Sequence, residues 1–424
     1  MKCIELTFAA ANGETVLQNL EQTACHIVFD GKKLSIELFY DFSSEPLRLT
    51  ADAERGDAVR LTVSPVRIGL YVNNALLDEE WPCGNGYLST ACAQSGTFAV
   101  HISMGELKQF ELSEQLRSGI KACELRKPGV NIGDCMPYSD ENGDGRYHLF
   151  YLLDRHHHRS KWHLGAHQWA HVSTEDFLHW DEHPMALPVT EPWEGSICTG
   201  SIIKSGDLWY AWYAVRMFDH SPARLSCAVS KDIMQFEKTG EYFTMPERYE
   251  PIGARDPKPF FACGQYHMLV TTRLKDGGGC LAHLVNERMA VEGWRDAGCF
   301  MHWYDFCPPG HPDRNQTPEC PDWFFFGGYY YLVFGIGSVS RYLYSKEPIG
   351  PWICPEDNHI PCGSVSKSAE LPGTGRRVFM GFRSEGGYAG SLRAAEAFPN
   401  GDGTLRFEAI EMNGETYPYP FMGC

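Results

Sequence analysis

The chain has 424 residues, 43% of them hydrophobic, which is enough for two or three domains with their own cores. Its net charge of −17 argues against a nucleic-acid partner, because phosphate binding needs a basic face. Since no run of about 18 apolar residues is present, we predict no membrane-spanning segment and no membrane partner.

Turn-forming and strand-forming residues dominate the composition. The 42 glycines, 26 prolines and 13% aromatic residues favour a turn-rich, all-β protein. The start, Met1-Lys2-Cys3-Ile4-Glu5, lacks the apolar core of a signal peptide, and none of the 16 cysteines forms a CxxC pair. We therefore interpret the cysteines as reduced thiols and predict a cytoplasmic protein.

Residues 1–122 alternate apolar and polar side chains in short runs separated by turns. Leu34–Leu38 and Val59–Val63 show this period of two, which is typical of a two-sheet sandwich. The segment Ile68–Pro82 resembles a hairpin of concanavalin or laminin-G sandwiches. We predict an N-terminal β-sandwich domain; carbohydrate binding, a structural role and homo-oligomer formation all stay open for it.

Five aromatic or apolar runs recur in the rest of the chain, with starts 47 to 64 residues apart. They are Tyr147–Tyr151, Trp209–Tyr213, Tyr266–Val270, Tyr330–Phe334 and Arg377–Gly381. Each follows a glycine-containing turn and precedes another strand-like segment, and the spacing is close to that of propeller blades. We predict that residues 123–424 form a five-bladed β-propeller, which leaves no long sheet edge exposed.

About ten to thirteen residues before each run lies the predicted innermost strand of a blade. These strands carry Asp134, Thr199, Asp256, Glu319 and Ser366. Innermost strands surround the propeller axis, so the three carboxylates should converge there. Crowded carboxylates repel, which leaves one ionised as a nucleophile or base and another protonated as a general acid. Glycoside cleavage needs that pair.

Several segments resemble glycoside hydrolase family 32, the invertase and levanase group. Tyr147–Tyr151 with Trp169–Thr174 resembles its first blade, and Gly387–Leu392 its last. Cys198-Thr199-Gly200-Ser201 is similar to the family's Phe-Ser-Gly-Ser segment. Arg255-Asp256-Pro257 and Glu319-Cys320-Pro321 match its Arg-Asp-Pro and Glu-Cys-Pro motifs. The five segments occur in the family's order over about 300 residues.

The resemblance implies a retaining hydrolase of terminal β-D-fructofuranosyl residues in small fructans or sucrose-type sugars. It makes Asp134 the nucleophile, Glu319 the general acid and base, and Asp256 the stabiliser of the transition state. It implies an oligosaccharide substrate and no cofactor. Further substrate contacts are expected from Arg255, Trp162, Trp169, His167, Thr199, Ser201, Cys320 and Arg341.

The chain departs from the family in two places that normally grip the fructosyl ring. Gly133–Pro137 replaces the usual Asn-Asp-Pro-Asn-Gly, and Leu152 replaces a glutamine. A hydrolase or transferase for another furanoside, such as an arabinofuranoside or a difructose anhydride, therefore stays open. So does a sugar-binding propeller without turnover.

A histidine-rich stretch between two predicted strands is compatible with a metal site. It contains His156, His157, His158, His163, His167 and His171. Because propeller hydrolases of this kind need no metal, we predict a polar loop over the funnel and no bound metal.

Overall fold

The computed structural model describes residues 2–41, 45–82, 86–106, 116–126, 130–140, 143–155, 167–191, 193–217, 219–412 and 415–416. The chain divides into two compact units, with the main division at Gln115, slightly before the predicted boundary at residue 122. Val189–Ser196 is grouped with the first unit. Among the described residues, no helix is long and apolar enough to cross a membrane.

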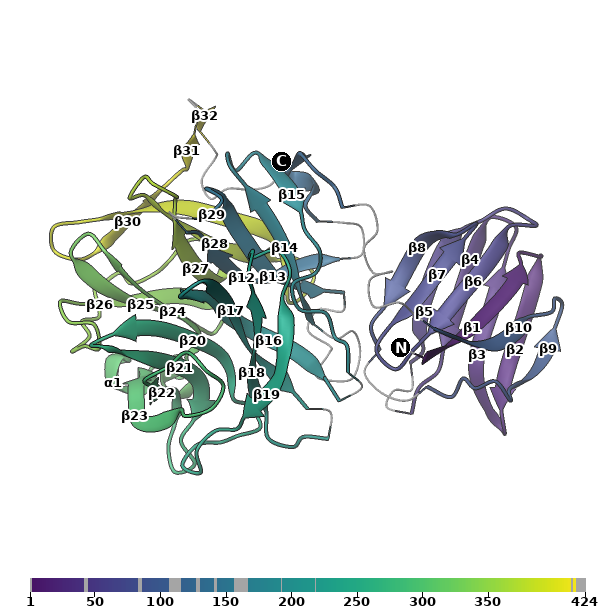
Figure 1. Ribbon diagram of the computed structural model, residues 1–424, viewed down its shortest axis with the longest axis horizontal. Helices are drawn as coiled ribbons and strands as arrows, with labels where there is room; N and C mark the ends of the chain where they lie inside the picture. Colours follow the sequence, from purple (N-terminus) through teal and green to yellow (C-terminus); the bar gives the residue numbers. More distant parts are fainter. Residues whose placement is uncertain are drawn as a thin grey trace. The chain divides into compact units, whose positions relative to one another are not determined.

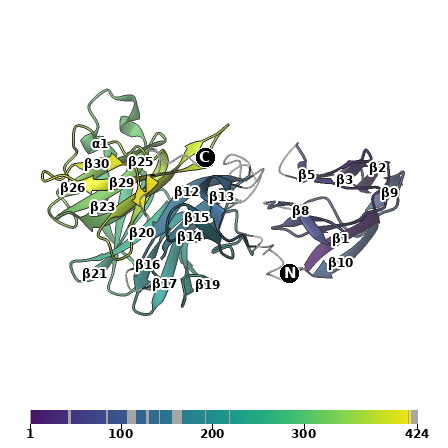
Figure 2. The ribbon, with the colours of Figure 1, turned by 90° about the horizontal axis from the view of Figure 1, so that it is seen from above.

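The first unit is a β-sandwich of two five-stranded antiparallel sheets, visible as two layers in Figure 2. One sheet has the order β10-β1-β6-β7-β8 and the other the order β5-β4-β3-β2-β9. The strands are β1 (Lys2–Ala9), β2 (Gly13–Asn19), β3 (Gln22–Phe29), β4 (Lys33–Leu38), β5 (Leu47–Asp52), β6 (Ala58–Val63), β7 (Ile68–Val72), β8 (Ala75–Glu80), β9 (Ala93–Gly96) and β10 (His101–Glu106).

Alternate side chains of the sandwich strands fill one core, as the period of two predicts. In β4, for example, Leu34, Ile36 and Leu38 are buried while Ser35 and Glu37 are not. They join Leu6 and Leu61 of the opposite sheet in a single apolar cluster. The predicted N-terminal sandwich is confirmed.

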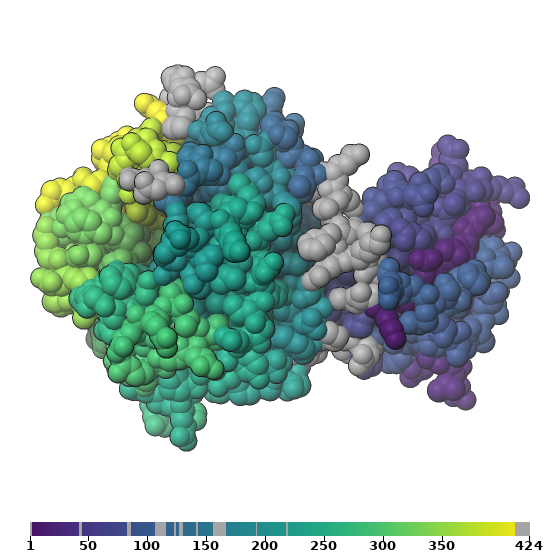
Figure 3. Space-filling model, in the orientation of Figure 1, coloured from purple at the N-terminus to yellow at the C-terminus, as the bar shows by residue number. Residues whose placement is uncertain are grey.

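The second unit is a five-bladed propeller whose blades follow one another in chain order (Figure 1). In the space-filling view, the colour of this unit changes with residue number from blue through teal and green to yellow (Figure 3). Blade 1 holds β12 (Asn131–Tyr138), β13 (Tyr147–Asp154), β14 (Gln168–Thr174), β15 (His179–Glu182) and β11 (Ile120–Lys121). Blade 2 holds β16 (Ser196–Ser205), β17 (Leu208–Arg216), β18 (Arg224–Ser230) and β19 (Glu237–Phe243). Blade 3 holds β20 (Arg255–Ala262), β21 (Gln265–Arg273), β22 (Gly279–Asn286) and β23 (Arg295–His302).

Blade 4 holds β24 (Glu319–Phe326), β25 (Tyr329–Ile336) and β26 (Val339–Ser345), and blade 5 holds β27 (Ser364–Glu370), β28 (Arg377–Ser384), β29 (Gly390–Pro399) and β30 (Leu405–Glu408). A short hairpin follows, β31 (Glu411–Met412) and β32 (Glu415–Thr416). The helical turns among the described residues are η1 (Ala122–Glu124), α1 (Trp303–Phe306) and η3 (Pro312–Asn315). The five predicted aromatic or apolar runs lie on the second strands of the five blades, which confirms the predicted propeller.

The first and last blades share one sheet. Ile132 of β12 pairs with Gly390 of β29, so the ring closes between the innermost strand of blade 1 and the third strand of blade 5. The hydroxyl of Tyr147 on β13 also donates to the carbonyl of Val378 on β28, at 2.9 Å. Closure therefore depends on direct contacts between segments more than 230 residues apart.

A bulge interrupts the innermost strand in at least four of the blades. Two residues of β12, β20, β24 and β27 oppose a single residue of the second strand, after Ile132, Arg255, Glu319 and Ser364 respectively. In three blades the first bulge residue has a left-handed backbone: Asp256 (φ 58°), Cys320 (φ 52°) and Val365 (φ 48°). Bulges re-aim side chains, and non-glycine residues with positive φ are uncommon.

Candidate active site

The bulges bring the three predicted carboxylates together at one end of the propeller axis. Glu319 immediately precedes the bulge of its strand, Asp256 is the first bulge residue of its strand, and Asp134 is the second. The three acids thus occupy three successive positions of one repeated feature. The sequence spacing placed them at matching positions only to within two residues.

Asp134 is 7% exposed, and both of its carboxylate oxygens accept hydrogen bonds. The hydroxyl of Tyr388 donates to Oδ1 at 2.7 Å. The hydroxyl of Thr199 donates to Oδ2, and the Cys320 thiol lies 3.4 Å from the same atom. Because these donors come from blades 5, 2 and 4, the carboxylate of blade 1 is fixed by three other blades.

Asp256 and Glu319 are joined through the arginine and cysteine of their motifs. The backbone N–H of Cys320 donates to Asp256 Oδ2 at 2.9 Å, so this cysteine touches two of the three acids. Arg255 donates to Glu319 Oε2 at 2.9 Å, and its Nε lies 3.6 Å from Asp256 Oδ2. Asp256 is 1% exposed, whereas the Glu319 side chain is 35% exposed and can meet solvent or a ligand.

Burial raises the pKa of both Asp134 and Glu319. For Asp134 the Thr199 and Tyr388 hydrogen bonds oppose this rise, and the charge of Asp256 adds to it. For Glu319 burial and Asp256 raise the pKa, while the Arg255 guanidinium lowers it. Asp134 thus has hydroxyl donors that favour its ionised form, while burial and the charge of Asp256 favour the protonated form of the partly exposed Glu319. This division suits a nucleophile and a general acid.

Tyr388 is the site residue that the sequence reasoning missed. Its ring stacks on His167 with centroids 5.5 Å apart, and its hydroxyl also lies 3.2 Å from the backbone nitrogen of Asp134. His167 in turn lies 2.8 Å from Asp154 Oδ1 through its Nε2, in a fully buried pair. Tyr388 is the polar aromatic residue of Gly387–Leu392, the segment that resembles the family's last blade. That combination was the signal that could have indicated it.

The other predicted contacts are divided between this site and the core. Thr199 and Cys320 touch Asp134, whereas the Ser201 hydroxyl donates to the Pro257 carbonyl at 2.9 Å and links blades 2 and 3. Arg341 lies on β26, where it donates to Asn358 at 2.8 Å. Trp162 lies outside the described residues.

The Trp169 ring is not exposed, as stacking on a sugar would require. Its side chain is 0% exposed, and its indole N–H donates to the Cys198 carbonyl at 2.9 Å. Both faces of β14 are buried, so period and composition could not tell a core tryptophan from a ligand-facing one. Trp169 instead packs behind Gly200, where a Cβ would lie 3.0 Å from its ring and 1.7 Å from the Trp212 carbonyl.

Three histidines of blade 1 lie close enough to hold a metal ion, but only His171 among them belongs to the predicted stretch. The candidate ligand atoms of His148, His171 and His183 all lie within 4.8 Å of one another. His156, His157, His158 and His163 lie outside the described residues. His148 Nδ1 and His171 Nε2 are 2.9 Å apart, and His148 Nε2 is 3.1 Å from Asp144.

Blade 3 repeats the histidine pair. His267 Nδ1 and His283 Nε2 are 2.7 Å apart, at the positions that correspond to His148 and His171. Burial lowers the pKa of His171, and lowers that of His283 to about 4. A hydrogen-bonded histidine pair that recurs in a second blade is accounted for as a link between adjacent strands.

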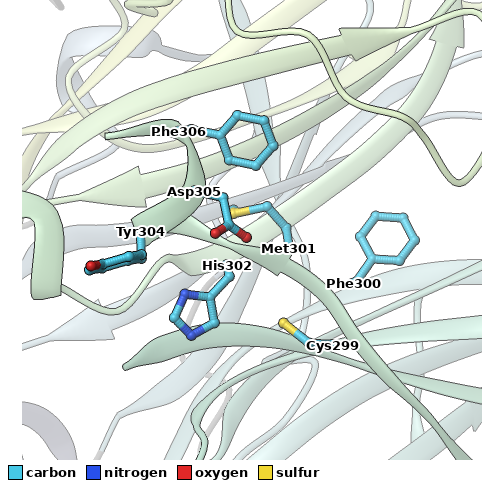
Figure 4. A pocket seen from close by; sticks show the side chains of 7 residues that line it. All are labelled: Cys299, Phe300, Met301, His302, Tyr304, Asp305 and Phe306. Atoms are coloured by element: carbon cyan, nitrogen blue, oxygen red, sulfur yellow. The ribbon is translucent and has the colours of Figure 1, made fainter. Parts of the chain in front are cut away.

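A pocket of about 440 Å³ lies on blade 3, away from the carboxylates (Figure 4). It is lined by the end of β23 and by α1, with His302, Tyr304 and Asp305 as its polar side chains. The Arg314 guanidinium lies 3.6 Å from the ring centre of Tyr304. None of the three acids is among its lining residues, so it is distinct from the site at the axis.

Part of the propeller matches a known protein family. Residues 140–347 match the family model described as "Glycosyl hydrolases family 32 N-terminal domain". The match includes Asp256 and Glu319 but begins after Asp134. The assignment of Asp134 to the site is therefore supported by its contacts with Thr199, Cys320 and Tyr388 and not by this match.

The similar curated proteins include the sucrose-6-phosphate hydrolase of Escherichia coli, 28% identical over 49% of this chain and 43% of that protein. The raffinose invertase of Escherichia coli is 26% identical over 46% of this chain and 40% of that protein. The chain thus spans less than half the length of these relatives.

Solved structures share the fold at low identity. Fructan 1-exohydrolase IIa from Cichorium intybus has a TM-score of 0.54 and 18% identity over 70% of this chain and 60% of that chain. A thermostable family-43 glycoside hydrolase has a TM-score of 0.50 and 16% identity, and covers 70% of this chain and 98% of that chain. The propeller accounts for both likenesses.

Proposed function

Because the chain belongs to glycoside hydrolase family 32, we propose that its propeller hydrolyses terminal β-D-fructofuranosyl residues of sucrose-type sugars and small fructans with retention of configuration. The observation that carries this proposal is the set of three carboxylates at the axis, each in a different environment. Asp134 is held by hydroxyl donors, Asp256 is buried beside an arginine, and Glu319 is partly exposed with a raised pKa.

In the first step the Asp134 carboxylate attacks the anomeric carbon and the bond to the leaving oxygen breaks. Glu319 gives its proton to that oxygen, so the leaving group departs as a neutral alcohol. The Thr199 and Tyr388 hydroxyls fix the attacking carboxylate, since each donates to one of its oxygens. Asp256 lies beside Asp134, since Cys320 contacts both acids, and it is assigned to the sugar hydroxyls, which it would hold as the ring becomes positively charged.

In the second step a water molecule hydrolyses the glycosyl–Asp134 ester. Glu319, now ionised, takes a proton from this water, and the water oxygen bonds to the anomeric carbon while Asp134 leaves as a carboxylate. Arg255 favours this ionised form, because its guanidinium donates to Glu319 Oε2 and lowers the pKa of that acid.

The test is product analysis by NMR, recorded before the released sugar mutarotates. Sucrose, a phosphorylated sucrose, a short fructan and an arabinofuranoside form the panel. We expect the β-anomer of fructose to be released first from a fructofuranoside. Release of the opposite anomer would show inversion, and an inactive wild type would favour a sugar-binding propeller.

Matched variants assign the roles. Asp134→Asn should abolish hydrolysis, and Glu319→Gln should slow both steps and leave a protein one fructosyl unit heavier by mass spectrometry when the leaving group is activated. The control is Glu370→Gln, which removes a carboxylate from the other end of β27 and should leave turnover unchanged. A fully active Asp134→Asn would disprove the assignment of the nucleophile.

A hydrolase or transferase for another furanoside is the second candidate. It is favoured by blade 1, where Gly133 and Leu152 depart from the family pattern next to the proposed nucleophile Asp134. A Cβ at Gly133 would lie 2.7 Å from the Tyr388 hydroxyl, and Leu152 is buried behind it. Faster release from the arabinofuranoside than from any fructoside would select this candidate.

A further inference from the structure

A second layer of side chains lies directly after the bulges. The first residue to pair again with the second strand is Cys135 in blade 1, Lys258 in blade 3, Asp322 in blade 4 and Lys367 in blade 5. Three of these four are charged, and residues at one register position of neighbouring blades face the same level of the axis. Neither lysine has a role in the proposed reaction.

The two lysines of this layer have different partners. Lys258 Nζ lies 2.7 Å from Asp322 Oδ1, and the other oxygen of Asp322 accepts from the backbone N–H of Ser368 at 2.9 Å. Lys258 is therefore part of an ordinary buried ion pair. Lys367, by contrast, is 2% exposed and donates to the backbone carbonyl of Gly200 at 2.7 Å.

The contact with the Gly200 carbonyl bears on the active site, because Gly200 directly follows Thr199. Thr199 supplies the hydroxyl that meets Asp134 Oδ2. Gly200 has no side chain with which to anchor itself, and its N–H lies 3.2 Å from the Met136 sulfur, a weak acceptor. The bond from Lys367 is therefore the charge-assisted one that fixes this part of β16.

Burial of an ammonium group costs free energy, which hydrogen bonds and nearby opposite charges must offset. The charged or titratable groups that face Lys367 are Cys320, Asp322, Lys258 and Asp256, and burial lowers its pKa against the pull of the acids. With Glu319 protonated as the general acid, the negative groups are Asp134, Asp256 and Asp322, and the positive groups are Arg255, Lys258 and Lys367. Loss of Lys367 would leave three negative groups with two positive ones.

We propose that Lys367 is a positioning residue of the proposed hydrolase, which holds the Gly200 carbonyl so that Thr199 stays on Asp134 and which offsets the charge of the carboxylates above it. It acts through Thr199 and through its field, and does not touch the substrate. The inference rests on the proposed function only for its kinetic consequences.

Lys367→Met keeps the volume of the side chain and removes the charge and the donor. We expect kcat on the best fructofuranoside to fall by about 10- to 100-fold with KM changed by less than about threefold. The acidic limb of the kcat/KM profile should move to higher pH, because the Asp134 carboxylate loses the Thr199 hydrogen bond that lowers its pKa. Lys367→Arg, which keeps the charge, should recover part of kcat.

A double-mutant cycle with Thr199→Val separates positioning from general damage. If Lys367 acts through Thr199, adding Lys367→Met to Thr199→Val should cost less than about threefold in kcat. Independent, multiplying losses together with an unmoved acidic limb would overturn the proposal. A merely structural role would lower thermal stability and leave the pH profile in place.

A structural readout keeps the test independent of the reaction. In a crystal structure of Lys367→Met we expect the Thr199 hydroxyl to have left hydrogen-bond distance of Asp134 Oδ2. If that contact is unchanged, the proposal is wrong even if the enzyme is slower. If wild type cleaves no furanoside but the contact is lost, the proposed function fails while the positioning role stands.

Discussion

The hydroxyl of Tyr388 offers the sharpest test of how the proposed nucleophile is tuned. Tyr388→Phe removes one oxygen atom and leaves the ring, which stacks on His167. The lost hydroxyl donates to Asp134 Oδ1 at 2.7 Å and lies 3.2 Å from the backbone nitrogen of the same residue. Because it favours the ionised carboxylate, its loss should raise the pKa of Asp134.

The size of the effect follows from the charge on the acceptor. A hydrogen bond to a charged group contributes about 1.5–3 kcal/mol, and one pKa unit corresponds to about 1.4 kcal/mol. The protonated acid keeps part of the interaction, so we take the lower end of this range. The pKa of Asp134 should therefore rise by about one unit, to be read as an upward shift of the acidic limb of kcat/KM by about one pH unit.

The assay is initial-rate hydrolysis of the best fructofuranoside across the acid range, with stability followed by thermal unfolding. Tyr147→Phe is the matched control: its buried hydroxyl also joins blades 1 and 5, but it donates to the Val378 carbonyl at 2.9 Å and touches no catalytic acid. Tyr388→Phe should lose about 1.5 kcal/mol of stability, and Tyr147→Phe, whose acceptor is a neutral carbonyl, about 1 kcal/mol. Only Tyr388→Phe should move the limb, and an unmoved limb in that variant, or an equal shift in both, would refute the reasoning.

Three further predictions concern the acid pair, the core behind it and the histidine pairs. Arg255→Gln removes the cation that lowers the pKa of Glu319, so the alkaline limb of kcat/KM should move to higher pH, while an unchanged limb would mean that another group is the general acid. Gly200→Ala should destabilise the propeller by about 3 kcal/mol or more in a urea unfolding series, because its Cβ would lie 1.7 Å from a backbone carbonyl; Gly401→Ala, where no atom lies within 4 Å, should be neutral within about 0.5 kcal/mol. Burial lowers the pKa of His283 to about 4, so the unfolded chain binds the proton first, and His283 should cost up to about 1.4 kcal/mol of stability per pH unit as pH falls from about 6.5 to 4. His283→Gln should flatten that slope, and an unaltered slope would show that the half-buried His283 does not titrate in this range.

The blades could be predicted from the sequence because each second strand is a compact apolar or aromatic run after a turn. Tyr147–Asp154 and Gln265–Arg273 show this clearly, since most of their side chains are buried. The three acids could be placed at the axis for the same reason. What could not be predicted was their register, because a bulge adds a residue to the strand without changing its composition.

Contacts between distant blades could not be predicted from the sequence either. Tyr388 reaches Asp134 over 254 residues, and Lys367 reaches Gly200 over 167. Neither pair is marked by a local pattern, and a lysine at an innermost strand would ordinarily be expected in solvent. Trp169 shows the opposite error, because a large aromatic near a sugar-binding motif can equally be part of the core.

The junction between blades 1 and 5 has a consequence for how the protein folds during its synthesis. Asp134 is made early, but Tyr388 emerges from the ribosome only after 254 further residues, which takes roughly 13–50 s at about 5–20 residues per second. Until then β12 has no strand β29 beside it, and the proposed nucleophile lacks one of its two hydroxyl donors. A nascent chain halted before blade 5 should therefore be inert, so that activity reports the joining of the last blade to the first.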